Sequence, residues 1–307
     1  MTGSNQTITL TSGWSGANFY YKVIFGSSDG VGTPVLDDIT LYYTANTAPT
    51  VSGAQINAQA NFTPVSNNTV VVNVTGQVLD ANGCSDVTTV TSLAYRSGVS
   101  STCSSNDNNC YRGITCSTSC SGTTISCTCA ASIWFHADPT DEGTYAAQWW
   151  VGSILATDSA NTTGIGSSAD SAPELTTLRA LDVTTSIAYG TVAPGADTGA
   201  TNKNVTVTAT GNAAIDCSVK GTDMTGGVGG TILASKQKYD LAAFTYSTGG
   251  TAFTAKNTDV SLELVCAKPS THPSDSTDII YWGLGVDNGT PAAADYSGTN
   301  TFTVTPE

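Results

Sequence analysis

The stretch "CYRGITCSTSCSGTTISCTC", residues 110–129, carries five of the nine cysteines in this 307-residue chain. Zinc sites favour closely paired cysteines together with a second such pair or with histidines. Cys116 and Cys120 have a suitable spacing, but Cys127 and Cys129 are too close together to be the usual second pair. The chain also lacks a C-x-x-C motif, which argues against thioredoxin-type redox chemistry. These spacings favour disulfides over a metal site.

Disulfides would stabilise this part of the folded chain. Residues 97–122 contain few apolar groups to offset the entropy lost on ordering them, and cross-links reduce that loss by restricting the unfolded chain. We expect at least three disulfides among Cys84, Cys103, Cys110, Cys116, Cys120, Cys127 and Cys129. The sequence does not say which cysteines pair, and because seven is an odd number one thiol stays unpaired within this set. Cys217 and Cys266 are predicted to pair with each other, the alternative being two buried free thiols.

The composition restricts the partners and the setting. Ten basic and 24 acidic residues give a net charge of −14, and only 11% of residues are charged. This balance argues against binding to nucleic acid or to an anionic membrane and favours divalent cations. No apolar stretch is long enough to span a membrane, and no signal peptide is visible. Because the many cysteines favour an oxidising compartment, we expect an extracellular or secreted protein. Without a visible signal peptide, the chain would be a mature form or a piece of a longer precursor.

Short alternating segments predict an all-β protein of tandem antiparallel β-sandwiches with a disulfide-rich insertion. Polar junctions at 44–53 and 159–174 divide the chain into partial strands at 1–45, a sandwich at 46–174 and a second sandwich at 175–307. The expected strands lie at 19–25, 37–43, 68–80, 87–96, 123–137, 143–158, 183–195, 203–221, 241–249, 259–268, 278–286 and 298–307.

One local motif favours an immunoglobulin-like sandwich. Asp141, Gly143 and Tyr145 have the spacing of a tyrosine corner, in which the tyrosine hydroxyl bonds back to the backbone. Ala147 stands where an antibody domain has its second cysteine, so Trp134 would supply core volume in place of that disulfide. The alternative is an ordinary loop.

Several stretches carry resemblances to known families. "NTAPTVSG" (46–53) and "VGSILATDSANTTG" (151–164) resemble the bacterial immunoglobulin-like and cadherin-like modules of large surface proteins. "YYKVIFGSSDGVGTPVLDDITLYY" (20–43) looks like the last strands of a jelly-roll module of the carbohydrate-binding type. "GNAAIDCSVKGTDM" (211–224) and residues 281–307 resemble the terminal sandwich of large secreted prokaryotic proteins. The resemblances imply an architecture and no catalytic residue.

Catalysis is not expected. His136 and His272 are the only histidines, no G-x-S-x-G elbow is present, and acidic pairs such as Asp37 and Asp38 lie at turn positions. We interpret His136 as a surface or edge-strand residue and His272 as part of a solvated loop.

Two weaker binding hypotheses remain. "DANGCSD" (80–86) offers Asp80, Asn82 and Asp86 as calcium ligands, with Asp158 at a module end, although a plain Asn-Gly turn is the favoured reading. Trp149 and Trp150 are adjacent on a predicted strand, so only one can face the core. The outward ring is available to a carbohydrate, a neighbouring module or a subunit interface.

These observations predict a non-enzymatic structural or adhesive surface protein that forms a stalk, fibre or surface layer. The alternative is an array of carbohydrate-binding modules accessory to an absent enzyme domain. Expected partners are other surface proteins, surface glycans, or further copies of the chain. In the last case the strands within residues 4–43 would complete a sheet in a neighbouring molecule. Those strands could instead pack on the adjacent module, or their missing partners could have been removed.

Overall fold

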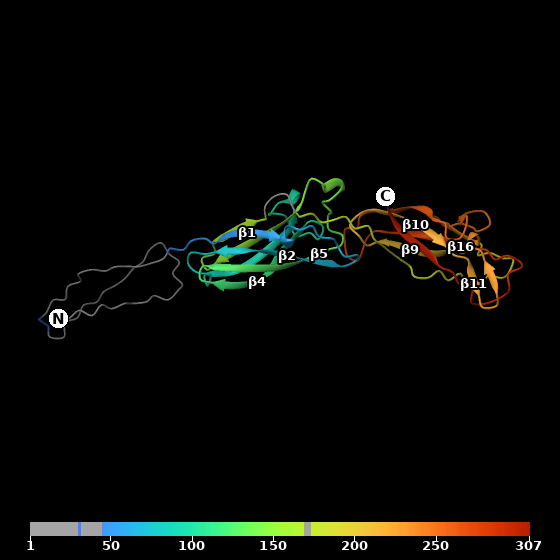
Figure 1. Cartoon of the computed structure of the whole chain (residues 1–307), viewed down its shortest axis with the longest axis horizontal. Helices are drawn as coiled ribbons and strands as arrows, with labels where there is room; N and C mark the ends of the chain where they lie inside the picture. The colour runs from blue at the N-terminus through green and yellow to red at the C-terminus, as the bar shows by residue number, and fades with distance from the viewer. Residues whose placement is uncertain (1–29, 32–44, 169–172) are drawn as a thin grey trace.

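A computed structural model describes residues 30–31, 45–168 and 173–307 (Figure 1). The expected strands at 19–25 and 37–43, and the strand-addition hypothesis built on them, lie outside the described residues. The described part is all-β, with antiparallel sheets and short 3-10 helices at Asn57–Gln59, Ser97–Val99, Gly143–Tyr145 and Ala234–Lys236. No helix in these ranges is long and apolar enough to cross a bilayer.

The first sandwich is built from one seven-stranded sheet that folds over on itself. Its strand order is β1-β2-β5-β4-β3-β6-β7. The strands are β1 (Thr50–Ile56), β2 (Thr69–Leu79), β3 (Val87–Arg96), β4 (Cys110–Ser121), β5 (Thr124–Trp134), β6 (Trp150–Asp158) and β7 (Thr163–Ser167).

Alternation along β5 directs one face of the strand into the first core. Every second residue from Ile125 to Ile133 is buried, while the residues between them are exposed. β2 pairs with β5 along its whole length and contributes Val72, Val74 and Val78 to the same core. Trp150, at the start of β6, is completely buried there. This regular period of two is the signal from which the sequence predicts a half-buried strand.

Glycines allow the two halves of the sheet to approach closely. A Cβ atom at Gly164 on β7 would lie 1.9 Å from the backbone oxygen of Pro49, and one at Gly152 on β6 would lie 2.9 Å from Ile56. No larger side chain fits at Gly164 without moving the backbone that leads into β1.

The disulfide-rich segment contains a strand that the sequence does not predict. β4 lies between β5 and β3, although its residues beyond Cys110 are mostly exposed and polar. Three disulfides connect this part of the chain: Cys84–Cys120, Cys103–Cys110 and Cys116–Cys129. The last joins directly opposite residues of β4 and β5. Covalent bonds therefore secure a strand that buries little apolar surface.

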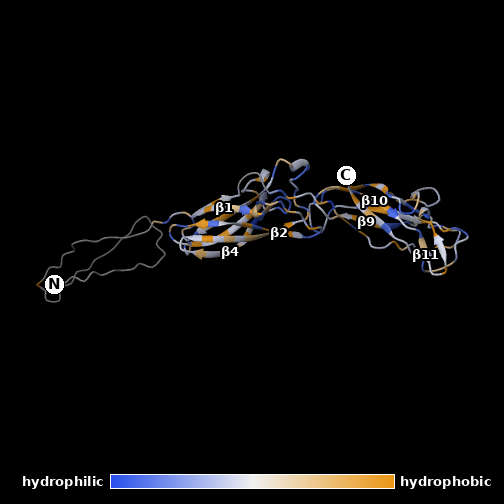
Figure 2. Ribbon diagram, viewed as in Figure 1, coloured by the Kyte–Doolittle hydropathy of each residue, from blue (hydrophilic) through white to orange (hydrophobic). Residues whose placement is uncertain are grey.

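The second sandwich has a separate core. Its strands are β8 (Leu181–Val183), β9 (Lys203–Ala209), β10 (Ile215–Gly221), β11 (Met224–Gly226), β12 (Gly230–Ile232), β13 (Gln237–Asp240), β14 (Thr251–Ala252), β15 (Val260–Cys266), β16 (Thr277–Leu284) and β17 (Asn300–Pro306). The sheet β15-β10-β17 and the sheet β14-β13-β16-β9-β8 enclose Trp282 and Phe253. Figure 2 shows apolar residues along the strands of both sandwiches.

Two strand predictions in the second sandwich are wrong. Residues 241–249 form no strand, and only the first residue of 183–195 belongs to one. Both stretches are rich in Thr, Ser, Gly and Ala, and neither has a neighbour that completes a backbone ladder. Rings within them instead pack on the sheet, as when the Tyr246 hydroxyl donates a hydrogen bond to the backbone oxygen of Lys236.

The predicted tyrosine corner is also absent. Tyr145 belongs to the 3-10 helix Gly143–Tyr145, and the strand expected from residue 143 begins only at Trp150. Its ring instead lies against the Arg96 guanidinium, 3.7 Å from the ring centroid. No described group accepts a hydrogen bond from its hydroxyl. Asp141, the first residue of the motif, bonds to Thr177 through both carboxylate oxygens.

The predicted disulfide between Cys217 and Cys266 is not formed, and Cys127 is the leftover thiol of the first sandwich. Register gives the reason in the second sandwich. Cys217 on β10 is opposite Leu262, whereas Cys266 on β15 is opposite Ile215, so the two cysteines are not direct partners. Burial raises the pKa of Cys217 to about 12 and that of Cys266 to about 11. All three thiols are buried.

Candidate functional site

Three carboxylates meet at one end of the first sandwich. Asp80 follows β2, Asp86 precedes β3, and Asp158 ends β6. One oxygen from each lies within 4.8 Å of the others. β3 pairs with β6 so that Val87 is opposite Asp158, which places Asp86 and Asp158 at the same edge. Three of the four predicted calcium ligands are thus brought together.

The cluster has oxygens without a partner. Asp80 and Asp158 are each only 1% exposed. Asp80 accepts a hydrogen bond from the Asn82 amide with one oxygen, while its Oδ2 has no partner among the described residues. Oδ2 of Asp86 is likewise buried and unpartnered within that part of the chain. Buried anionic oxygens are unfavourable unless a positive group compensates them.

Asp158 is held in its ionised form by neutral donors. The hydroxyl of Thr162, followed by the side-chain amide of Asn46 and the backbone amides of Thr162 and Ala160, lowers the pKa of Asp158 below its ordinary value. Asn46 donates to Oδ2 at 2.9 Å, and the two backbone amides donate to Oδ1 at 2.8 and 3.0 Å. The carboxylate is therefore fixed in place before any cation binds.

Asn82 lies in the turn that the sequence favours rather than acting as a calcium ligand. Its Oδ1 accepts a hydrogen bond of 2.8 Å from the Thr47 amide, and its Nδ2 donates one of 3.0 Å to the Ala45 oxygen. Both polar atoms thus bind the chain that enters the sandwich, so Asn82 is a positioning residue here. Carboxylate oxygens are ligands that calcium prefers, and water can complete a shell of about six to eight oxygens. Asp80, Asp86 and Asp158 are the residues that would hold such an ion.

A second cluster of charged groups lies where the two sandwiches meet. Asp138, which follows β5, is 5% exposed. Its Oδ2 lies 3.1 Å from Nε of Arg96, in the same sandwich, and its Oδ1 lies 3.2 Å from Nζ of Lys268, in the second. Lys268 also donates a hydrogen bond of 3.0 Å to Oδ1 of Asn108. One buried carboxylate therefore binds cations from both sandwiches.

Hydrogen bonds fix the connecting segment at the same junction. Asn212, fully buried in the second sandwich, accepts a bond of 2.6 Å from the Leu178 amide and donates one of 3.1 Å to the Thr176 oxygen. The Asn67 amide of the first sandwich donates to the backbone oxygen of Thr210 at 3.0 Å. The connecting segment is thus bonded to the second sandwich, and through Thr177 and Asp141 to the first.

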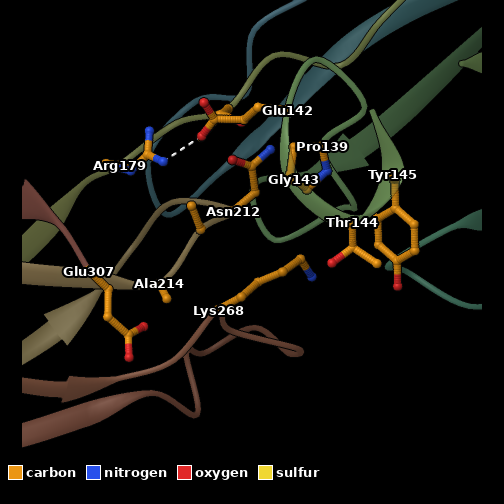
Figure 3. A pocket seen from close by; sticks show the side chains of 12 residues that line it. Pro139, Glu142, Gly143, Thr144, Tyr145, Arg179, Asn212, Ala214, Lys268 and Glu307 are labelled. Carbon is orange, nitrogen blue, oxygen red and sulfur yellow. Dashed lines mark hydrogen bonds and ion pairs between the residues drawn. The ribbon is translucent and has the colours of Figure 1, made fainter. Parts of the chain in front are cut away.

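A hollow of about 390 Å³ opens beside this junction (Figure 3). It is lined by the loop of Pro139 to Tyr145, by Arg179 of the connecting segment, and by Lys268 and Glu307 of the second sandwich. Arg179 forms an ion pair with Glu142 across it. This ion pair joins the loop of the first sandwich to the connecting segment.

Of the two histidines, His272 lies in an exposed loop as predicted, whereas His136 does not lie on the surface. His136 is 1% exposed rather than on the surface, and neither ring nitrogen has a hydrogen-bond partner among the described residues. Burial lowers its pKa, and the charge of Lys268 lowers it further. His272 is exposed but not free, because its ring stacks on that of Trp134 with 4.4 Å between centroids. This stack adds a further contact between the sandwiches.

The two adjacent tryptophans have different environments. Trp150 is fully buried, and its indole Nε1 donates a hydrogen bond of 3.1 Å to the backbone oxygen of Asp138. Trp149 packs against a small cluster around Tyr95 and Val151 and is partly buried. It lines a hollow of about 430 Å³ together with serines of the neighbouring loops.

Comparisons with known proteins provide little guidance. No family model matches the chain, and no curated protein matches it. A solved structure of a chaperone–tip adhesin complex, described as vital for activation of CFA/I fimbriae biogenesis, aligns with 85% of this chain and 84% of its own. The identity is 9% and the TM-score is 0.28. A similarity this low supports no conclusion about the fold or the function.

Proposed function

We propose that the chain is a non-enzymatic structural part of an extracellular surface protein, in which two β-sandwiches are fixed end to end as a stiff rod. The buried polar contacts at the junction between the two sandwiches support this proposal. Asp138 is buried between Arg96 and Lys268, and Asn212 binds the connecting segment. Figure 1 shows the two sandwiches following one another along the long axis of the molecule. Flexible boundaries between independent modules are places where few contacts cross.

Covalent and compositional features support the extracellular setting. Three disulfides form within one sandwich, and disulfides persist in oxidising compartments. The three acidic residues Asp80, Asp86 and Asp158 would bind calcium, which is abundant outside cells, at the end where the preceding chain enters. Calcium there would stiffen the entry to the first sandwich as the ion pairs stiffen its exit.

The proposal assigns no catalytic role. Within the described ranges neither ring nitrogen of the buried His136 has a hydrogen-bond partner. The sequence makes two finer predictions. The rod would be part of a fibre, a stalk or a surface layer, and one hypothesis is that copies join through residues 1–43.

Electron microscopy tests the proposal directly. Immunogold labelling of the source cells with an antibody against this chain should place the gold on the cell surface or on material released from it. Negative-stain images of the purified chain should show two connected bodies at one narrow distribution of angles. Gold confined to the cell interior would refute the surface role, and a broad distribution of angles would refute the stiff rod.

Carbohydrate binding is the second candidate function, favoured by one observation. Trp149 lines the hollow with Tyr95, Ser97 and Gln148. An aromatic ring beside hydroxyl and amide groups matches the chemistry of a sugar. Glycan-array binding that is lost in Trp149→Ala, with the fold retained by circular dichroism, would support this function. An array without signal would remove it.

A further inference from the structure

An amine and a carboxamide from different sandwiches lie in contact at the junction. Nζ of Lys268 is 3.0 Å from Oδ1 of Asn108. Nδ2 of Asn108 donates a hydrogen bond of 3.0 Å to the backbone oxygen of Ser270. The two ends of the Asn108 amide are therefore held by groups on the second sandwich, and the lysine amine lies against its carbonyl oxygen.

Asp138, a proton carrier, lies beside the amine, and its backbone amide donates a hydrogen bond of 2.7 Å to the backbone oxygen of Asn108. Oδ1 of Asp138 is 3.2 Å from Nζ of Lys268. Its other oxygen is bound by Nε of Arg96, which fixes the orientation of the carboxylate. The Asp138 side chain is 8% exposed, so water competes little for the oxygen that faces the amine.

The surroundings make the lysine ammonium easier to deprotonate. Burial lowers the pKa of Lys268, and this effect outweighs the opposing attraction of Asp138. Arg96 repels the ammonium form as well. A lysine amine becomes nucleophilic when it loses its proton in such a desolvated place.

We propose that Lys268 and Asn108 react to form an amide bond that joins the two sandwiches covalently. The ammonium of Lys268 gives a proton to Asp138, and the neutral Nζ attacks Cγ of Asn108 to form the new C–N bond. Asp138 then delivers that proton to Nδ2, the Cγ–Nδ2 bond breaks and ammonia leaves. Nζ, now the nitrogen of the new amide, loses its surplus proton to Asp138, and the ammonia takes this proton up to depart as ammonium. Charge and atoms balance without an oxidant, a metal or a co-reactant.

The amide bond would make the contact between the two sandwiches covalent, whereas their hydrogen bonds and ion pairs are reversible. The two residues are separated by 160 positions in the sequence, so the bond would close a loop that contains most of the second sandwich. Closing a long loop restricts the unfolded chain strongly. The inference does not depend on the proposed surface role, because it concerns bond formation within the purified chain.

Intact-mass spectrometry of the reduced and denatured full chain tests the proposal. We expect a mass lower than that of the sequence by one ammonia. We also expect a peptide pair joined through Lys268 and Asn108 after proteolysis. A chain of full mass, in which Lys268 and Asn108 appear only in unmodified peptides, would overturn the proposal.

Variants distinguish this bond from other losses of ammonia, such as cyclisation at Asn82-Gly83. Lys268→Arg keeps the cation and Asn108→Ala removes the electrophile, so both should restore the full mass. Asp138→Asn should leave most of the chain unlinked. Lys256→Arg, at an exposed pair with Asp223, is the matched control and should still lose ammonia. Circular dichroism of each variant establishes that it is folded. Loss of ammonia that persists in folded Lys268→Arg would contradict the proposal, and its persistence in folded Asp138→Asn would exclude Asp138 as the proton carrier.

Discussion

The side chain of Asp80 is a buried carboxylate that is not fully compensated by described groups. It lies in the interior with one oxygen bonded to the Asn82 amide and the other without a partner among the described residues. Two more carboxylates, Asp86 and Asp158, face the same point. Three like charges at this separation repel one another strongly when they are shielded from water. A bound cation removes that repulsion.

Calcium is therefore expected to raise the melting temperature of the full chain relative to the same protein in a chelator. Binding to the folded state alone stabilises it by mass action, with about 2.7 kcal/mol at a hundredfold excess over the dissociation constant. Asp80→Asn should abolish this dependence. Asp259→Asn, at an exposed pair with Lys220, should retain it. Equal melting curves of the wild type with calcium and with chelator would contradict the site.

His136 is expected to make the protein less stable in mild acid. Because its folded pKa lies below the ordinary 6.5, the unfolded chain takes up a proton first as the pH falls. The contribution of this residue is complete above 6.5 and is lost progressively as the pH falls below that value. Urea unfolding at a series of pH values measures the loss. His136→Gln should flatten the profile between pH 6.5 and the range where carboxylates titrate, and an unchanged slope would argue that other groups cause it.

Tyr145→Phe is expected to change stability by less than about 0.5 kcal/mol, the usual range away from special features. The substitution keeps the ring that lies 3.7 Å from the Arg96 guanidinium and removes a hydroxyl without a described partner. Tyr145→Ala should cost about 1 kcal/mol, because it removes the cation–π contact. Chemical denaturation of both variants makes the comparison. A large loss for Tyr145→Phe would restore the tyrosine-corner interpretation.

At the scale of elements, the sequence predicts strands whose alternation is strong and misses those that are held by other means. β5 alternates without a break and is predicted almost to its ends. β4 has few apolar residues, so its alternation carries no hydrophobic signal, and only the cysteines mark it. Residues 241–249 show the opposite error, because β-prone residues there find no ladder partner.

Removal of the disulfides one pair at a time should rank them by the loop that each closes. The separations are 36 residues for Cys84–Cys120, 13 for Cys116–Cys129 and 7 for Cys103–Cys110. In the chain-entropy model these loops contribute about 4, 3 and 2 kcal/mol to the free energy of unfolding. Paired Cys→Ser variants and urea denaturation measure each value. A reversed order would show that packing around β4, rather than loop closure, governs the stabilisation.

At the scale of the whole molecule, local patterns locate one candidate site and miss the other. Asp80, Asn82 and Asp86 lie within seven residues, and Asp158 is in a recognisable module end, so the sequence can group them. Asp138, Lys268 and Asn108 are brought together only because the second sandwich docks on the first. No spacing in the sequence encodes that docking, and a lone lysine or asparagine in a polar loop has no distinguishing signal.

The junction should make the two sandwiches unfold together. Each has its own core, so without the junction each would melt at its own temperature. Asn212 and Asp141 each make two hydrogen bonds to the connecting segment, and typical bonds of this kind contribute about 1 kcal/mol each. We therefore expect a single calorimetric transition for the wild type, and two for the double variant Asn212→Ala/Asp141→Ala. Asp240→Ala, in the second sandwich and away from the junction, should preserve the single transition. Two separate transitions in the wild type would show that the contacts at the junction are too weak to couple the sandwiches, and the stiff-rod interpretation would fail with them.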